Sequence, residues 1–161
     1  MSIICYIISV RKGELAMMIS TKGRYALRVM IELASHDPEK FIPLKQIAAE
    51  QNISEKYLEA IVKLLVKDGM IIGLRGKGGG YKLAKAPSSY TVGSILRLTE
   101  GSLAPVSCLE CQPVSCPRAE TCTTLPMWRE LDSLINNYLD SVSLEDLIGQ
   151  SQGCPGDDYI I

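Results

Sequence analysis

The sequence predicts a mainly α-helical protein with one small β-hairpin, arranged as a winged helix-turn-helix followed by one long helix. Three observations support this fold class. Apolar residues recur at helical spacing in separate blocks of the first hundred residues. A glycine-rich stretch, Gly76 to Gly80, lies between two short runs of strand-forming residues. A long apolar stripe then follows at helical spacing over residues 127–139.

Two helices are expected to form the core of the module. Residues 21–34 are dense in apolar side chains at helical spacing, and either Ser20 or Thr21 can serve as the N-cap. A shorter helix is expected from Val92 to Leu98, capped by Thr91. Both helices are rich enough in aliphatic residues to pack against each other inside one small domain.

A helix-turn-helix lies between these two helices. Pro43 opens a short helix, and the chain turns at Gln51-Asn52. Ser54 then caps a second helix, which Gly69 ends. Two helices joined by a turn of a few residues are typical of DNA-binding proteins, in which the second helix enters the major groove.

A β-hairpin wing is predicted directly after this pair of helices. Met70–Ile72 and Tyr81–Leu83 are short strand-forming runs, and the glycines between them allow the backbone to approach another surface closely. Arg75 and Lys77 place positive charge at the tip, as contact with a phosphate backbone or a minor groove requires. A nucleotide-binding loop is the competing interpretation, but the spacing matches neither the dinucleotide motif nor the P-loop.

The two halves of the chain carry opposite charge. Residues 18–97 hold 13 basic and 7 acidic side chains, a net charge of +6. Residues 98–161 hold 2 basic and 10 acidic side chains, a net charge of -8. A basic half favours a polyanionic partner, and the acidic half is expected to have a separate task.

Six cysteines are present, and four of them cluster. Cys108, Cys111, Cys116 and Cys122 fall within fifteen residues, whereas the other two, Cys5 and Cys154, lie near the ends. Such clustering favours a metal site over a disulfide framework. The spacing matches none of the common zinc fingers, zinc ribbons or ferredoxins, so iron and zinc both remain open at this point.

The terminal segments predict a protein of the reducing cytoplasm with no membrane contact. The apolar run Ile3–Val10 is too short to span a bilayer and lacks the flanks of an export signal. We interpret residues 1–16 as an upstream extension, because Arg11–Glu14 is what a translated ribosome-binding sequence would encode. Residues 149–161 are rich in Gly, Gln and Asp and are expected to form a disordered tail.

Three segments carry a family resemblance: STKGRYAL at 20–27, ISEKYLE at 53–59 and LRGKGGGY at 74–81. They are similar to the first helix, recognition helix and wing of the winged-helix transcription regulators that include IscR, NsrR and CymR, with IscR nearest. The resemblance covers about residues 17–148. It implies a homodimer that binds near-palindromic, double-stranded operator DNA, with a DNA-binding domain at 17–98.

The resemblance also implies which residues contact DNA. They lie at the start of the first helix, at the start of the recognition helix and in the wing. In IscR-type proteins the position of Glu59 is associated with the choice between classes of DNA site. The alternative is that Glu59 is only a solvent-exposed residue of the helix surface. The expected contacts are Thr21, Lys22, Arg24, Tyr25, Ser54, Glu55, Lys56, Tyr57, Glu59, Arg75, Gly76, Lys77, Gly78 and Gly79.

For the cysteine-rich loop, residues 99–124, the resemblance implies an iron–sulfur cluster, 2Fe–2S rather than 4Fe–4S. Cys108, Cys116 and Cys122 match the three cysteines of cluster-binding members. The sequence departs from the family at the fourth ligand: IscR has a histidine where Leu125 stands, and NsrR an aspartate about where Arg24 stands. Cys111 is the first candidate for the fourth ligand, and Glu110 or Glu120 is the second choice. The single histidine, His36, is expected at the surface.

Residues 125–148 are expected to form a long helix followed by a short terminal helix. Its apolar stripe is too large for one small domain to cover, and the resemblance implies that it packs against a second subunit; the alternative is an intramolecular core helix. The expected interface residues are Trp128, Leu131, Leu134, Ile135, Tyr138 and Leu139.

Three functions follow from these features. The first is a repressor whose operator binding depends on the cluster and which controls cluster-assembly, cysteine or redox-stress genes. The second is a cluster-free, CymR-type regulator of cysteine metabolism that acts with a partner protein, or a zinc-stabilised regulator. The third is a thiol oxidoreductase using Cys108 and Cys111. The third lacks any redox fold pattern, so the sequence predicts a protein that is not an enzyme.

Overall fold

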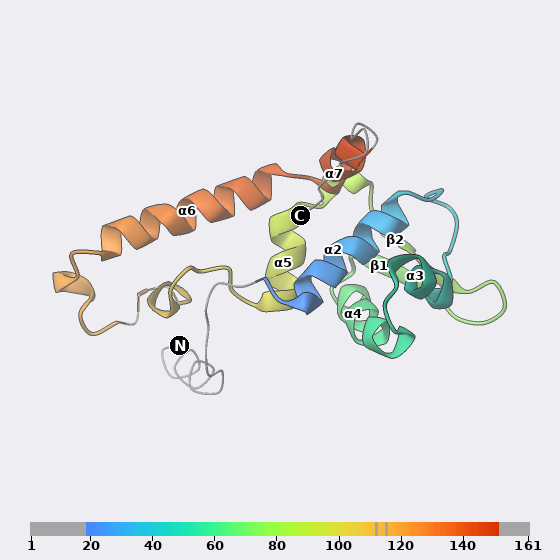
Figure 1. Cartoon of the computed structure of the whole chain (residues 1–161), viewed down its shortest axis with the longest axis horizontal. Helices are drawn as coiled ribbons and strands as arrows, with labels where there is room; N and C mark the ends of the chain where they lie inside the picture. The colour runs from blue at the N-terminus through green and yellow to red at the C-terminus, as the bar shows by residue number, and fades with distance from the viewer. Residues whose placement is uncertain (1–18, 112, 115, 152–161) are drawn as a thin grey trace, which may run out of the picture.

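The computed structural model describes residues 19–111, 113–114 and 116–151. Helices dominate this part of the chain, and one two-stranded sheet interrupts them (Figure 1). The predicted extension at residues 1–16, the tail from residue 152 onward, Cys5 and Cys154 all lie outside the described residues.

The first three helices of the described residues are α2 (Thr21–Ala34), α3 (Leu44–Gln51) and α4 (Glu55–Lys67). Ser20 and Ser54 are the N-caps of α2 and α4, and their hydroxyls accept hydrogen bonds from Gly23 N at 3.2 Å and Tyr57 N at 3.3 Å. Asn52 adopts the left-handed conformation between α3 and α4, which allows the short turn. The predicted helix-turn-helix is confirmed.

The hairpin consists of β1 (Ile71–Leu74) and β2 (Gly80–Leu83), paired antiparallel from Ile71 opposite Leu83 to Leu74 opposite Gly80. Ile42 forms a bridge to Tyr81, with backbone N–H to O distances of 2.9 Å in both directions. A side chain at Gly80 would collide with the backbone of Ile42, so only glycine allows this close approach. The bridge ties β2, near the end of the hairpin ladder that borders the wing loop, to the segment before α3.

The core forms where α2, α4 and the hairpin meet α5 (Val92–Glu100), which follows the short 3₁₀ turn Pro87–Ser89. Met30, Leu58 and Ile95 are fully buried at its centre. Ser20 donates to the Glu100 carboxylate at 2.7 Å, so the start of α2 is held against the end of α5. The mainly α-helical fold with a β-hairpin, predicted from periodicity, is confirmed.

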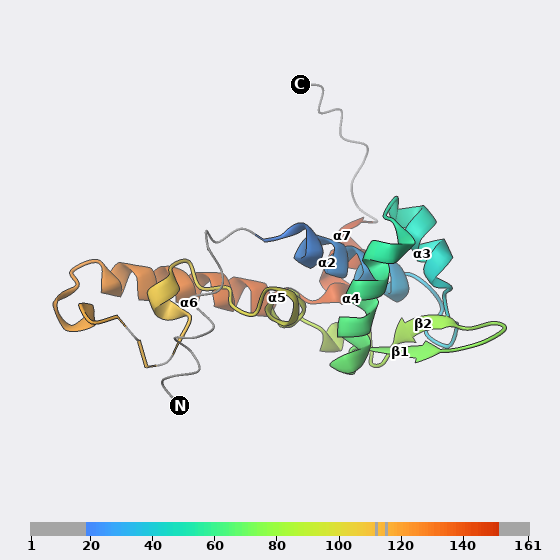
Figure 2. The same ribbon diagram turned by 90° about the horizontal axis from the view of Figure 1, so that it is seen from below.

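The second half of the chain extends away from this core. Two 3₁₀ turns, Ser107–Leu109 and Ala119–Thr121, lead into α6 (Leu125–Ser141), which projects from the body of the molecule in both ribbon views (Figures 1 and 2). At its base, Arg97 Nη1 of α5 donates to Asn136 at 2.8 Å, and Arg97 also contacts Asp140. These contacts join α6 to α5.

The terminal helix α7 (Leu144–Ser151) returns the chain to the core, where Leu144 is fully buried. Ser143 and Asp146 cap it reciprocally: Asp146 N donates to Ser143 Oγ at 3.1 Å, and Ser143 N donates to Asp146 at 2.8 Å. Helix α7 includes residues 149–151, which the sequence analysis had assigned to a disordered tail. Among the described residues, no helix is long and apolar enough to cross a membrane.

Leu144→Ala should test how firmly α7 is docked. Removing a fully buried leucine side chain should lower the free energy of unfolding by about 2–5 kcal/mol. Denaturant unfolding at fixed protein concentration measures this change. Ile72→Ala, on a wing residue that is 45% exposed, is the control and should cost less than about 0.5 kcal/mol. Equal stability of the two variants would show that α7 does not contribute to the core.

Candidate nucleic-acid interface and cysteine loop

Helix α4 separates a buried face from an exposed one. Leu58, Ile61, Val62 and Leu65 are buried in the core. Glu55, Lys56 and Glu59 point to solvent, as does Tyr57, which is 40% exposed. The residues expected to read DNA therefore share the outer surface of one helix, which is the arrangement a major-groove helix needs. Ser54, at the start of this surface, is occupied in capping the helix.

An aromatic and cationic cluster connects this surface to α2. The rings of Tyr25 and Tyr57 meet edge to face, with centroids 5.7 Å apart. The Arg28 guanidinium lies over the Tyr25 ring at 5.4 Å, and its Nε donates to Gln51 Oε1 at 2.8 Å. Arg28 was missed in the sequence analysis, although its position one helical turn after Arg24 could have indicated a shared face.

The DNA contacts predicted at the start of α2 differ in whether their side chains are free to reach DNA. Thr21 and Arg24 are exposed, and Arg24 Nη2 donates to Thr21 Oγ1 at 3.2 Å. Lys22 Nζ donates to the carbonyl oxygen of Thr99 at 3.2 Å. Its charge thus stabilises the C-terminal end of α5, where the helix dipole favours a cation. Lys22 contributes to domain packing, and Arg24 is the freer cation.

The wing presents its cations without intramolecular partners. Arg75 and Lys77 are exposed, and within the described residues neither has a hydrogen bond or an ion pair. Gly76 and Gly78 have φ values of 98° and 79°, so the tip follows a path that other residues disfavour. The hairpin extends outward beyond α3 and α4 (Figure 2). Glu59, by contrast, is paired with Lys63 at 3.5 Å.

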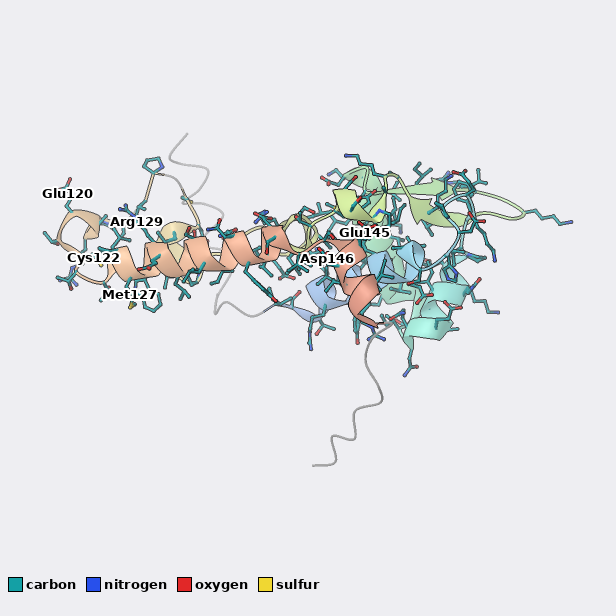
Figure 3. All side chains as sticks on the ribbon, turned by 90° about the horizontal axis from the view of Figure 1, so that it is seen from above. Glu120, Cys122, Met127, Arg129, Glu145 and Asp146 are labelled. Carbon is teal, nitrogen blue, oxygen red and sulfur yellow. The ribbon has the colours of Figure 1, made fainter. Side chains whose placement is uncertain are left out.

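The loop between α5 and α6 brings cysteines to the far end of the molecule. Cys108, Cys116 and Cys122 are half-buried free thiols, whereas Cys111 is disulfide-bonded. Cys122 lies just before α6, at the end of that helix most distant from the wing, with Glu120 beside it (Figure 3). A disulfide sulfur cannot act as a thiolate ligand, so Cys111 can ligate a metal only after reduction.

The local surroundings of Cys122 favour the thiolate form of its side chain. The pKa of this thiol is lowered, first by its contact with the Thr124 hydroxyl at 3.4 Å and then by backbone hydrogen bonding at Thr124. Smaller contributions come from Leu125 N–H and the positive charge of Arg118. The thiolate is the form that binds metals.

The structure does not gather the predicted cluster ligands. Thiolate donors suit an iron–sulfur cluster, but among the described residues Cys108, Cys116 and Cys122 do not bring their sulfur atoms within one coordination sphere. Leu125 is buried and offers no donor atom. Glu110 is half-buried and Glu120 is exposed, and neither joins the cysteines in a ligand group. Holding a cluster therefore requires the loop to close around it.

Helix α6 leaves part of its apolar stripe uncovered. Leu134 and Tyr138 are 60% and 68% exposed, and Leu125 is the only buried residue of the helix. This exposure contradicts the alternative of an intramolecular core helix. An apolar groove of about 230 Å³ lies at the base of the helix. Its lining residues are Ile19, Leu103, Ile135, Tyr138 and Leu139.

The remaining residues of the predicted stripe are less open. Trp128 is half-buried, as are Ile135 and Leu139, whereas Leu131 is exposed. Met127 and Arg129 project from different sides of the first turns of α6 (Figure 3). The exposed apolar surface thus runs along one side of a helix of 17 residues.

Comparison with known proteins agrees with this architecture. Residues 19–150 match the model of the Rrf2 family, described as an iron-dependent transcriptional regulator. The transcriptional regulator IscR of Erwinia tasmaniensis is 35% identical over 137 residues, which are 84% of this chain and 81% of that protein. CymR of Bacillus subtilis is 40% identical over 137 residues, 85% of this chain and 94% of that protein.

Solved structures show the same fold. The structure of CymR, the global cysteine regulator of B. subtilis, matches with a TM-score of 0.69 at 40% identity and covers 83% of this chain and 97% of that one. The structure of T. potens IscR matches with a TM-score of 0.67 at 32% identity and covers 88% of this chain and 94% of that one. These relatives are named as regulators and not as enzymes. The chain belongs to the Rrf2 family of transcriptional regulators.

Proposed function

We propose that this regulator binds operator DNA as a homodimer and that an iron–sulfur cluster in its cysteine loop controls that binding, with repression as the outcome. The observation that carries the DNA interface is the common exposure of the α4 surface and of the unpaired wing cations. The α4 surface suits the major groove, and Arg75 and Lys77 suit the adjoining backbone or minor groove.

The uncovered stripe of α6 supports a homodimer. A second copy that buries Leu131, Leu134 and Tyr138 would remove a large apolar surface from water. An operator of two half-sites then follows from the twofold symmetry of such a pair.

Three free thiols support the cluster, and the family's description as iron-dependent agrees with it. We propose Cys108, Cys116 and Cys122 as ligands of a 2Fe–2S cluster, with reduced Cys111 completing the set. When bound, the cluster would supply a redox-active group whose presence orders the loop next to α6. A change in loop order needs to alter operator affinity by only about 1–3 kcal/mol to act as a switch.

A cluster-free regulator of cysteine metabolism is the second candidate. The dispersed sulfur atoms and the 40% identity to CymR favour it. Such a regulator would act through a partner protein, or a zinc ion would replace the cluster in the loop. Absorption spectra with iron, sulfide and zinc analysis of anaerobically purified protein separate the candidates, because only the cluster requires acid-labile sulfide.

Arg75→Ala should weaken operator binding and reduce the dependence of the affinity on salt concentration. Losing one phosphate contact lowers the slope of log K against log salt by about one. Fluorescence anisotropy with a fixed operator over several salt concentrations measures both changes. Arg129→Ala, which removes the same charge from α6, is the matched control. Identical salt slopes for Arg75→Ala and wild type would remove the wing from the interface.

Leu134→Asp should disrupt the homodimer, because a carboxylate in an apolar interface must either remain charged at a cost of several kcal/mol or take up a proton. Since Leu134 is 60% exposed in the single chain, the substitution should leave the monomer folded. Sedimentation velocity and circular dichroism report the two properties separately. A folded variant that still sediments as a dimer would place the interface elsewhere.

Cys116→Ser and Cys122→Ser should abolish the visible chromophore of anaerobically reconstituted protein, since each removes a proposed core ligand. Cys111→Ser should be milder and should shift the spectrum or the reduction potential. Cys5→Ser is the control and should leave the spectrum unchanged. Iron content that is unaffected by all three loop substitutions would exclude the cluster and favour the cluster-free regulator.

A further inference from the structure

A histidine and two carboxylates meet outside both the DNA surface and the cysteine loop. Glu32 lies near the end of α2, His36 follows that helix, and Glu50 lies at the end of α3. His36 Nε2 is 3.0 Å from Glu32 Oε1 and 3.8 Å from Glu50 Oε2. Within the part of the chain that the structure describes, this is the only such group whose donor atoms lie within 4.8 Å of one another.

The spacing of these donor atoms suits a small divalent cation. Zinc binds histidine nitrogen and carboxylate oxygen at about 2.0–2.2 Å in a tetrahedral arrangement, which separates neighbouring donor atoms by about 3.3–3.6 Å. The two distances from His36 Nε2, 3.0 and 3.8 Å, lie on either side of that range. Small side-chain rotations are therefore enough to form the coordination sphere.

Two glutamines orient the carboxylates. Gln51 Nε2 donates to Glu32 Oε2 at 2.6 Å, and Gln46 Nε2 donates to Glu50 Oε1 at 3.0 Å. Each amide holds the oxygen that faces away from His36, so the other oxygen of each carboxylate is directed toward the imidazole. Hydrogen bonds of this kind position the ligands in protein metal sites.

The donor oxygens of Glu32 and Glu50 lie within 4.8 Å of each other, so their charges interact. Partial burial raises the pKa of Glu32, and its hydrogen bond with Glu50 raises it further. The same hydrogen bond lowers the pKa of Glu50. Two neighbouring carboxylates repel each other when both are ionised, and a divalent cation bound by both would offset that repulsion.

We propose that Glu32, His36 and Glu50 form a second metal site, separate from the cysteine loop, for zinc or a similar divalent cation. Three protein ligands leave the fourth position of a tetrahedral ion for water. Because Glu32 lies on α2, His36 just after it and Glu50 on α3, the bound ion joins the core helix to the first helix of the helix-turn-helix. It thereby restricts how α3 is placed beside α4.

Zinc titration of the full-length, untagged protein tests this site, after its free thiols have been alkylated so that the cysteine loop cannot bind the metal. His36 is the only histidine of the chain, so its imidazole gives a single set of ring resonances in ¹H–¹⁵N NMR spectra. One equivalent of zinc should shift the Nε2 resonance and raise the midpoint of thermal unfolding.

Glu50→Gln and Glu32→Gln should each weaken zinc binding at least about 10-fold, since each removes a ligand and a charge. Glu39→Gln makes the same change at an exposed carboxylate outside the group and should bind zinc like wild type. Circular dichroism checks that each variant is folded. If Glu32→Gln unfolds, Glu50→Gln still tests the site, because Glu50 is the more exposed of the two carboxylates. A His36 resonance that zinc does not move, or equal affinities for Glu50→Gln and Glu39→Gln, would overturn the proposal.

Discussion

The burial of one face of α4 is the constraint on which the rest of the structure depends. Leu58, Ile61 and Leu65 pack into the core with Met30 of α2 and Ile95 of α5. Close-packed interiors tolerate little rotation of a helix, so this packing determines which side chains of α4 face outward. The outward-facing surface of α4 is therefore a consequence of the core, and the Tyr25–Tyr57 contact couples it to α2.

Helix α6 depends on the same core through a narrow attachment. Arg97 contacts Asn136 and Asp140 at the base of the helix, and Leu144 anchors the chain again just beyond its end. Among the described residues, Leu131, Leu134 and Tyr138 of α6 keep exposed apolar side chains. A partner subunit that covers this stripe would set the distance between two DNA-reading modules. The cysteine loop precedes the free end of α6, so changes in the loop act where the helix is least constrained.

Both proposed metal sites would act by restraining a connection between elements. The cysteine loop joins α5 to α6, whereas the Glu32–His36–Glu50 group joins α2 to α3. A ligand changes a conformational equilibrium only through different affinities for the two states. The thiols of the loop must move closer together to bind a metal as a set, whereas the His36 group already holds its donor atoms within 4.8 Å of one another. The two sites would therefore respond to metals in different ways.

The amino-acid sequence alone determined most of the helices and the hairpin, as well as which residues make up the predicted DNA-binding surface and the apolar stripe of α6. Helical periodicity, the caps Ser20, Ser54 and Thr91, and the wing glycines specify elements through interactions between near neighbours, which can be read along the chain. Tertiary packing alone decided the roles of Lys22, Arg28 and His36. Lys22 contacts Thr99, Arg28 contacts Gln51, and His36 contacts Glu50. These partners lie on other helices, so each contact depends on the angle and distance at which two helices pack, and neither quantity is encoded in the spacing of residues along one helix.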